Sequence, residues 1–254
     1  MIITSTKELM ARYNEVGQGD IFVGKLGTGE LKGFLLIDLL ERGVCCVPSP
    51  LSQIISGSKV VQALLLNKWM LPNTLVISRR KNLIDAIGQY NRLGIQSVIT
   101  KEDRMHCGFG IRKWDSVETL YSFISMSESS YPFILQPFME NVTDIRVVVA
   151  GDYIEAYTRH NPDNFRMNMA TGGSSRPFVL DEEKEKLCRA VMDRGKFPFA
   201  HIDILIASDG KHYLSEIALN GGIKGAGTGR VELDKKKQEV IESIIKMNMP
   251  RPGL

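Results

Sequence analysis

The chain has 254 residues, of which 43% are hydrophobic and 24% charged, and its formal net charge is +3. This is the composition of a globular protein, and the weak, dispersed positive charge argues against a nucleic-acid-binding domain, whose basic residues cluster. No apolar run approaches the ~20 residues that cross a membrane. We therefore expect neither nucleic acid nor a membrane among the partners.

The cysteines indicate the cellular compartment. They lack the spacing of a metal site, and neighbouring cysteines rarely form a disulfide with each other. The four are Cys45, Cys46, Cys107 and Cys188. Free cysteines are typical of a reducing compartment, and the N-terminus lacks the apolar region of a signal peptide. We therefore expect a cytoplasmic protein.

The N-terminal part predicts a small parallel sheet. Residues 20–26 alternate in polarity like a strand, residues 31–42 have the pattern of a helix that ends at Gly43, and residues 44–47 form a short apolar run before Pro48. A strand, a helix and a strand in this order are typical of a parallel βαβ unit.

The rest of the chain predicts mixed helices and strands. Residues 49–70 begin with the capping-type serines Ser49 and Ser52 and continue into an amphipathic helix, SKVVQALLLNKWM. Further helices are expected at 81–93, about 115–126, 181–194 and about 231–246. Further strands are expected at 73–77, 95–101, 132–138, 144–150, 153–159, 200–207 and 211–218. The notable loops are a glycine-containing one at 102–110, a polar one that runs to about 179, and a glycine-rich one at 221–229.

A hairpin in the last third predicts a pair of opposed carboxylates. The dipeptide at 209–210, Asp-Gly, is typical of a two-residue turn, which pairs Ser208 with Lys211 and places Asp203 directly opposite Glu216. Their Cβ atoms are then about 5 Å apart, and the like charges destabilise the sheet unless a hard cation such as Mg²⁺ offsets the repulsion. The alternatives are a protonated carboxylate, solvation of both at a sheet edge, or a shifted register. The same register assigns the core face to Ile202, Ile204, Ile206, Tyr213 and Ile217.

A second hairpin predicts a polar sheet face. The turn at 151–152, Gly-Asp, places Asp144 opposite Arg159 and Arg146 opposite Tyr157. The other face of the same strands is apolar and belongs to the core. A face as polar as this one is either exposed to solvent or the floor of a site.

The loop between the hairpins carries residues suited to an anion. Arg166 and Asn168 are two positions apart and share a face in an extended chain, and the glycines at 172–173 allow the backbone to approach a ligand closely. The arginine fork suits phosphate or carboxylate. A plain surface loop is the alternative.

Several segments, in order, carry a family resemblance: GVCCVPSPLSQIISGSK, ITKEDRMHCGFGI, ILQPFME, TDIRVVVAGDYIEAYTR, NFRMNMATGGSS, AHIDIL and LSEIALNGG. Together they resemble the ATP-grasp superfamily and, within it, the RimK-like and glutathione-synthetase-like ligases, from about residue 43 to about 225. The resemblance implies an α/β (α+β) fold in which two lobes clasp ATP. It implies a short N-terminal domain over 1–55, a first lobe over 56–130 and a second lobe with the metal site over 131–254.

The resemblance also implies which residues bind the nucleotide, with ATP and Mg²⁺ (or Mn²⁺) as cofactors. Lys59 and Lys101 correspond to two lysines that reach the phosphates, and Gly108 and Gly110 give freedom to a flap at 102–110. Arg146 belongs to the family's Asp-x-Arg pattern. The adenine edge is expected on the backbone of Gln136, Pro137, Phe138 and Met139.

The residues implied at the reacting phosphoryl group are Arg166 and Asn168, and those implied at the metal are Asp203 and Glu216. The family usually has Glu-x-Asn at the last ligand position, but Ala218 stands two residues after Glu216. Either a bulge lets Asn220 supply the missing oxygen or one metal site is weakened. The N-terminal domain is short for the family, so the substrate pocket is reduced or is shared with a second copy in a homo-oligomer.

The reaction implied by the resemblance joins a carboxylate to an amine. The carboxylate attacks the γ-phosphate of ATP, an acyl phosphate and ADP form, and the amine then displaces phosphate. We expect addition of an amino acid such as glutamate to an acceptor. The alternatives are a small-molecule kinase on the same fold and, because of Ala218, a non-catalytic ATP-binding subunit. A nicotinamide dehydrogenase is disfavoured because GKLGTGELKG has the wrong glycine spacing.

Overall fold

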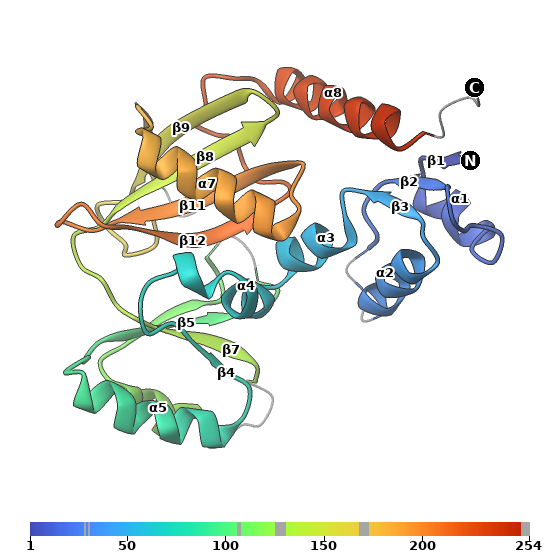
Figure 1. The fold of residues 1–254 in the computed structure, drawn as a ribbon. Helices are drawn as coiled ribbons and strands as arrows, with labels where there is room; N and C mark the ends of the chain where they lie inside the picture. The colour runs from blue at the N-terminus through green and yellow to red at the C-terminus, as the bar shows by residue number, and fades with distance from the viewer. Residues whose placement is uncertain (28, 30, 106–107, 125–130, 168–172, 250–254) are drawn as a thin grey trace.

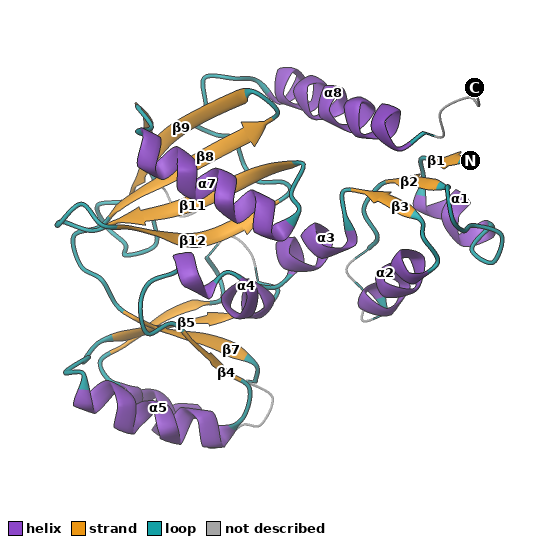
Figure 2. Cartoon of the chain, in the orientation of Figure 1, coloured by secondary structure: helices purple, strands orange, loops and turns teal. Residues whose placement is uncertain are grey.

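The computed structural model describes residues 1–27, 29, 31–105, 108–124, 131–167 and 173–249. In that part of the chain the strands form three sheets. The helices α3 (Pro50–Gly57) and α4 (Lys59–Leu65) lie between the sheets (Figure 1). Figure 2 shows the same view coloured by helix, strand and loop.

The N-terminal sheet is parallel, as predicted, with the order β1-β2-β3. Its elements are β1 (Ile2–Ile3), α1 (Thr6–Ala11), β2 (Ile21–Val23), α2 (Lys32–Glu41) and β3 (Cys45–Val47). Phe22, Leu36 and Leu39 are buried in its core. Gly43 has a φ of +74°, which allows the chain to leave α2 and enter β3 directly.

The segment 49–70, in which the sequence predicts capping serines followed by a helix from Ser58, forms three short elements. The chain forms α3 (Pro50–Gly57), α4 (Lys59–Leu65) and a 3-10 turn, η1 (Asn67–Trp69). Ser58 interrupts the helix because its backbone is extended and its hydroxyl accepts a hydrogen bond from the amide of Val61 at 3.1 Å. A serine that caps its own following turn competes with continuous helix.

The middle sheet has the order β4-β7-β5-β6 and is antiparallel throughout. Its strands are β4 (Leu75–Ile77), β5 (Val98–Glu102), β6 (Ile111–Trp114) and β7 (Phe133–Pro137), and its helices are α5 (Arg80–Arg92) and α6 (Val117–Ile124). Both helices contribute buried side chains, among them Leu83, Tyr90 and Leu120, to one core with the sheet. Strand β7 lies beyond the domain boundary predicted at residue 130 and completes this sheet; the boundaries themselves stay predictions.

The large sheet is antiparallel, with the order β10-β9-β8-β11-β12. Its elements are β8 (Thr143–Ala150), β9 (Tyr153–His160), β10 (Ser174–Phe178), α7 (Glu182–Gly195), β11 (Phe199–Ile206), β12 (His212–Ala218) and α8 (Arg230–Asn248). The side chains of α3, α4 and α7 share its core. Helix α8 extends from this sheet toward the N-terminal domain and contacts β2 and β3 (Figure 1).

The loop predicted to run to about 179 is wrong over its last part, because β10 occupies residues 174–178. The sequence of this strand, SSRPF, has no apolar alternation, and it pairs with β9 on one side only. Proline is tolerated in such an edge strand because one side of the strand needs no ladder hydrogen bonds.

The β8–β9 hairpin has the predicted register, with Asp144 opposite Arg159. In the β11–β12 hairpin the predicted pair of Asp203 and Glu216 is confirmed, but the pairing of Ser208 with Lys211 is wrong. The turn holds one more residue than predicted: the amide of Ala207 donates to the carbonyl of Lys211 at 2.8 Å.

A register shift between Asp203 and Ile204 restores the predicted pairing at the carboxylates. The extra turn residue and the irregularity near Ser215 cancel each other. As a consequence Leu214 lies opposite Ile204 on the core face, where it is 1% exposed. Tyr213, which the sequence predicts on that face, pairs with Leu205 instead.

Candidate active site

The opposed carboxylates form the centre of the site, and cations of the protein neutralise each of them. Asp203 accepts hydrogen bonds from Arg146, at 2.7 Å from Nε and 2.9 Å from the terminal nitrogen. Arg159 reaches the same carboxylate at 2.9 Å. Glu216 pairs with Lys59, whose Nζ lies 3.2 Å from its Oε1. The repulsion inferred from the sequence is thus offset by protein side chains.

Arg159 also binds Asp144, with Nε and Oδ1 2.6 Å apart, so two aspartates share two guanidiniums. All four side chains come from the three adjacent strands β8, β9 and β11. Burial opposes ionisation of Asp203, but Arg146 and Arg159 outweigh it and hold its pKa well below the usual range. For Asp144 burial exceeds the effect of Arg159 and raises the pKa to about 6. Both carboxylates are therefore predominantly ionised at neutral pH.

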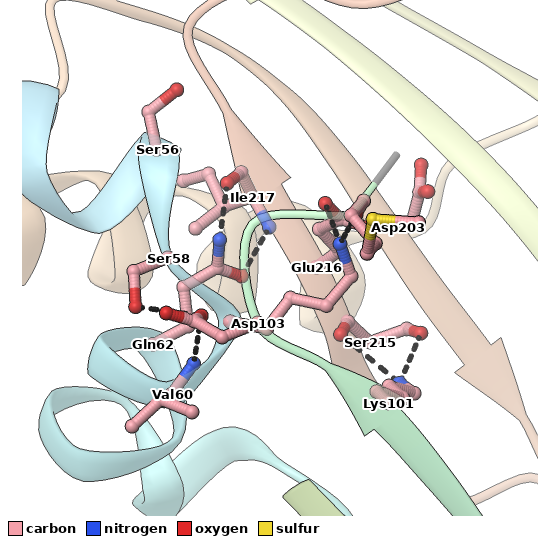
Figure 3. A network of polar contacts seen from close by, with 12 residues as sticks. Ser56, Ser58, Val60, Gln62, Lys101, Asp103, Asp203, Ser215, Glu216 and Ile217 are labelled. Carbon is pink, nitrogen blue, oxygen red and sulfur yellow. Dashed lines mark hydrogen bonds and ion pairs between the residues drawn. The ribbon is translucent and has the colours of Figure 1, made fainter. Parts of the chain in front are cut away.

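Lys101 approaches the carboxylates from the middle sheet. It lies on β5 and is 5% exposed, and its Nζ donates to the hydroxyl of Ser215 at 3.2 Å and to the carbonyl of Ser215 at 3.4 Å (Figure 3). Burial lowers its pKa to about 8, although Glu216 acts in the opposite direction. A buried ammonium with only neutral hydrogen-bond partners is poised to receive an anion.

Lys59 opens α4 and is also buried. Besides pairing with Glu216, its ammonium donates to the carbonyl of Met105, near the start of the predicted flap. The structure therefore pairs Lys59 with Glu216 and places Lys101 on Ser215, the residue before Glu216.

The base of the predicted flap is attached to α4. The carboxylate of Asp103 accepts from the hydroxyl of Ser58 at 2.8 Å and from the amide of Val60 at 3.1 Å. Gly108 has a φ of +75°, and a Cβ on Gly110 would lie only 2.7 Å from that of Met105. Both glycines are thus required by the local backbone.

The predicted adenine segment lies where β7 leads into the large sheet. The side-chain Nε2 of Gln136 donates to Thr74 Oγ1 at 2.8 Å, and the backbone amide of Phe138 donates to the carbonyl of Ser97 at 2.9 Å. The Phe138 ring packs edge-on against Phe165, with centroids 6.1 Å apart, and the Lys113 ammonium lies 3.9 Å from its centroid. The adenine-binding role of this segment, which includes Pro137 and Met139, stays a prediction.

Of the two residues expected at the phosphoryl group, only Arg166 lies among the described residues; Asn168 lies outside them. The guanidinium of Arg166 donates to the carbonyl of Ile111 on β6 at 3.0 Å and stacks on Phe165. Arg166 therefore connects the loop after β9 to the end of the flap.

The residues implied at the metal fit a hard cation in part. Asp203 and Glu216 provide oxygen ligands, and the Glu216 side chain is 32% exposed, so a cation has access to it. Asn220 Oδ1 accepts from Lys237 Nζ at 2.8 Å. Within the described residues no group of three or more His, Cys, Asp or Glu side chains could hold a metal ion alone. A magnesium ion here would need oxygens from a phosphate or from water, which is its usual habit. The ligand role of Asn220 stays a prediction.

Sequence reasoning missed the side chains that hold β12 in place. Strand β12 is an edge strand, yet Gln62 of α4 bonds its backbone twice, with the amide of Ile217 at 3.0 Å and its carbonyl at 2.9 Å (Figure 3). Ser56 Oγ accepts from the amide of Leu219 at 3.0 Å. Gln62 is 1% exposed and lies among the apolar residues of its helix, a polar interruption that could have marked it.

His201 lies opposite Ala218, as predicted. Its Nδ1 is buried without a hydrogen-bond partner among the described residues, and its Nε2 lies 3.3 Å from Lys237 Nζ. Burial, followed by the charges of Lys237 and Arg146, lowers its pKa to about 3. The imidazole is therefore neutral at pH 7 and is packed against Gly221.

Comparison with known proteins identifies the family to which the chain belongs. The model of the RimK-like ATP-grasp domain matches residues 57–244. The alpha-aminoadipate–LysW ligase LysX of Saccharolobus solfataricus is 29% identical over 167 residues, which are 63% of this chain and 58% of the relative. The coenzyme gamma-F420-2:alpha-L-glutamate ligase of Methanococcus maripaludis is 27% identical over 57% of this chain and 52% of the relative. The chain thus spans little more than half the length of these curated relatives.

A solved structure shows the same fold. The D-alanine–D-alanine ligase of Bacillus anthracis superposes with a TM-score of 0.66 at 15% identity, over 96% of this chain and 85% of that one. The predicted ATP-grasp fold is thereby confirmed.

In the described part of the chain, none of the helices combines the length and apolarity that crossing a membrane requires.

Replacing Gln62 should destabilise the protein. The variant Gln62→Ala leaves the buried amide and carbonyl of Ile217 without their partners, which should lower the free energy of unfolding by about 2–3 kcal/mol. Urea denaturation measures this difference. The control is Gln238→Ala, an exposed glutamine on α8, which should change stability by less than about 0.5 kcal/mol. A Gln62→Ala protein as stable as this control would show that the two bonds contribute nothing.

Acid should destabilise the protein through His201. Its folded pKa of about 3 lies below the unfolded value of 6.5, so the unfolded chain binds more protons at mildly acidic pH. Stability is therefore present above pH 6.5 and is lost as the pH falls toward 3. From pH 7 to pH 5 the wild type should lose about 2 kcal/mol more than His201→Gln.

Urea denaturation of both proteins at several pH values, in buffer with a chelator, measures this loss. The difference between the two proteins isolates the histidine because Asp144, which titrates in the same range, is present in both. Parallel stability curves would contradict the assignment of a neutral, buried imidazole.

Proposed function

Because the chain belongs to the RimK-like ATP-grasp family, we propose that it is an ATP-dependent ligase that joins a carboxylate to an amine and releases ADP and phosphate. One observation carries the proposal: Lys59 pairs with Glu216, which lies opposite Asp203, and Lys101 bonds to the neighbouring Ser215. This arrangement suits a magnesium-bound polyphosphate, because the buried ammonium groups can neutralise the phosphates and the carboxylates can bind the magnesium ion.

The substrates are proposed as an amino acid such as glutamate and an acceptor amine. The two curated relatives support this choice, since one is named for alpha-aminoadipate and LysW and the other for coenzyme F420-2 and L-glutamate. Both names describe the joining of an acidic amino acid to a larger partner.

In the proposed mechanism Asp203 and Glu216 would hold the magnesium ion, which supplies charge neutralisation for the phosphates. Lys59 and Lys101 bind the phosphate oxygens and stabilise the charge that moves to the leaving ADP. Arg146 and Arg159 keep Asp203 ionised, which is the protonation state that a metal ligand needs. Asp103 fixes the turn that carries Lys59.

The flap and Arg166 complete the proposed site. The backbone from Glu102 to Met105 lies against α4 and excludes water from one side of Lys59. Arg166 contacts the end of the same loop through Ile111, which brings a guanidinium toward the region where the phosphoryl group is transferred. Exclusion of water protects an acyl phosphate from hydrolysis before the amine attacks.

The test is an assay of ADP and free phosphate with ATP, magnesium and pools of carboxylates and amines, with and without hydroxylamine. Carboxylate-dependent ADP release with trapping of a hydroxamate supports the ligase. In the same assay Glu216→Ala should reduce turnover at least 100-fold (about 3 kcal/mol) because a metal ligand is lost. Its circular dichroism spectrum should be unchanged.

The matched control for this variant is Glu232→Ala, an exposed glutamate on α8, which should keep full activity. Full activity of Glu216→Ala would refute the metal role. ADP release without free phosphate would indicate a kinase, and ATP binding without turnover in any pool would indicate a binding subunit.

Loss of Lys101 should weaken nucleotide binding. The variant Lys101→Ala removes a buried charge that faces the proposed phosphates, and charge-assisted hydrogen bonds of this kind contribute about 1.5–3 kcal/mol, or at least tenfold in Kd. Calorimetry with ATP and magnesium measures the change. Lys81→Ala, an exposed lysine on α5, serves as the control and should bind ATP like the wild type. An unaltered Kd for Lys101→Ala would remove this lysine from the nucleotide site.

A further inference from the structure

A buried lysine of α8, Lys237, contacts the segment that follows the strand carrying Glu216. Its side chain is 5% exposed, and its Nζ donates to Asn220 Oδ1 at 2.8 Å and to the carbonyl of Leu219 at 3.2 Å. Both acceptors belong to segment 219–222, which begins directly after β12. Helix α8 is therefore bonded to the end of the hairpin on which the proposed metal ligands lie.

The ammonium of Lys237 has neutral partners. Among the described residues, none of the ion pairs includes it. Its other neighbours are His201, whose Nε2 is 3.3 Å away, and Phe199, whose ring centroid is 4.9 Å away. Burial lowers its pKa to about 8, although Asp234 acts in the opposite direction. Because burial of an ammonium without an anion is costly, packing alone does not account for a lysine here.

Two arginines bind the rest of segment 219–222. Arg230 of α8 donates to the carbonyl of Gly221 at 2.8 Å, and Arg146 of β8 donates to the carbonyl of Gly222 at 3.1 Å. The hydroxyl of Tyr157 on β9 also donates to the carbonyl of Gly222, at 3.2 Å. The segment is therefore bonded to α8 at its beginning and to the large sheet at its end.

The bond between Arg146 and Gly222 connects the segment to Asp203. The other two nitrogens of the same guanidinium donate to the Asp203 carboxylate, at 2.7 and 2.9 Å. Because a guanidinium is planar and rigid, fixing one nitrogen on the carbonyl of Gly222 also fixes the two that bind Asp203. A displacement of segment 219–222 would therefore change the orientation of Arg146 and of the carboxylate that it holds.

The segment also lies against the sheet face that carries Asp203. A Cβ on Gly221 would be 3.0 Å from His201 Nδ1, so the backbone of the segment approaches this imidazole closely. His201 precedes Asp203 by two positions on β11, and their side chains share a face of the sheet. Glu216 lies opposite Asp203. Lys237 thus holds a segment that contacts the sheet face of both proposed metal ligands.

We propose that Lys237 is a positioning residue of the metal site, which fixes segment 219–222 and, through Arg146, orients Asp203. This inference rests on the proposed function, in which Asp203 and Glu216 would hold the magnesium ion. Lys237 itself touches neither substrate nor metal. Groups that orient metal ligands contribute about 10–100-fold to metal affinity or activity, so loss of Lys237 should have an effect at the lower end of this range.

The test is calorimetry of the full chain with ADP, once with Mn²⁺ and once with a chelator. Lys237→Met removes the donors but keeps a side chain of similar length, whereas Lys237→Gln keeps N–H donors without the charge. Lys237→Met should weaken ADP binding in Mn²⁺ about tenfold, and Lys237→Gln should weaken it less. ADP binding in the chelator should be the same in all three proteins.

Arg230→Ala provides a variant at an exposed position that leaves the bonds of Lys237 intact, so a failure of Lys237→Met to fold does not obscure the result. It removes the other bond from α8 to the segment and should weaken Mn²⁺-dependent ADP binding in the same direction. Lys235→Met, at an exposed position of the same helix, is the control and should bind like the wild type.

Urea denaturation of each variant separates positioning from folding. A lysine with a merely structural role would lower the free energy of unfolding in Lys237→Met and leave the Kd of the folded protein for ADP in Mn²⁺ unchanged. That result would overturn the proposal. Equal weakening of ADP binding in Mn²⁺ and in the chelator would also overturn it, because the effect would then not involve the metal.

The outcomes also separate this inference from the ligase proposal, because binding requires no turnover. Mn²⁺-dependent ADP binding that depends on Lys237, without carboxylate-dependent ADP release, would keep the positioning role and reject the ligase. Carboxylate-dependent ADP release together with unchanged Mn²⁺-dependent binding in Lys237→Met and Arg230→Ala would keep the ligase and reject the positioning role. A wild type whose ADP binding does not respond to Mn²⁺ would likewise reject the positioning role.

Discussion

The carboxylates of Asp203 and Glu216 lie opposite each other on neighbouring strands, and the structure depends on how their charges are balanced. Asp203 is neutralised from within the large sheet by Arg146 and Arg159, whereas Glu216 is neutralised by Lys59 from α4. Because buried charges are costly without a partner, each pair fixes the elements that supply it. The ion pairs of Asp203 hold β8, β9 and β11 in register. The ion pair of Glu216 holds α4 against the edge of the sheet.

Strand β12 shows how the two lobes share one site. An edge strand presents unpaired amides and carbonyls, which usually face solvent or invite another strand. Here Gln62, Ser56 and Lys101 bond to successive parts of that edge, and all three come from outside the large sheet. The strand that carries Glu216 is therefore positioned by the first lobe as much as by its own sheet. A change in the angle between the lobes must alter the surroundings of Glu216, which links conformational change to the site.

The sequence predicted local features well and long-range contacts poorly. The turn at 151–152 determined the β8–β9 register, and the pairing of Asp203 with Glu216 was right because the longer turn and the irregularity near Ser215 offset each other. The helix α3 was not predicted as a separate element, because its capping serines were interpreted as leading into the helix that begins at Ser58. Strand β10 was missed because it has no alternation, and its pairing with β9 supplies the order. That Arg146 and Arg159 would bind Asp203 depended on the pairing of β8 with β11, which no turn specifies. The bond between Gln62 and Ile217 could not be predicted from local sequence patterns either, because the two residues are 155 positions apart.

The charges around the site favour a bound anion. Arg146, Arg159, Lys59 and Lys101 face three carboxylates, those of Asp144, Asp203 and Glu216. The cations are in excess, and the one with the weakest compensation is Lys101, whose partners are the neutral groups of Ser215. Burial lowers its pKa, and the charge of Glu216 offsets this effect only in part. An incoming phosphate would supply the missing negative charge, raise the affinity of Lys101 for its proton and so stabilise the charged form that binds it. Under the proposed function, nucleotide binding and protonation of Lys101 should therefore reinforce each other.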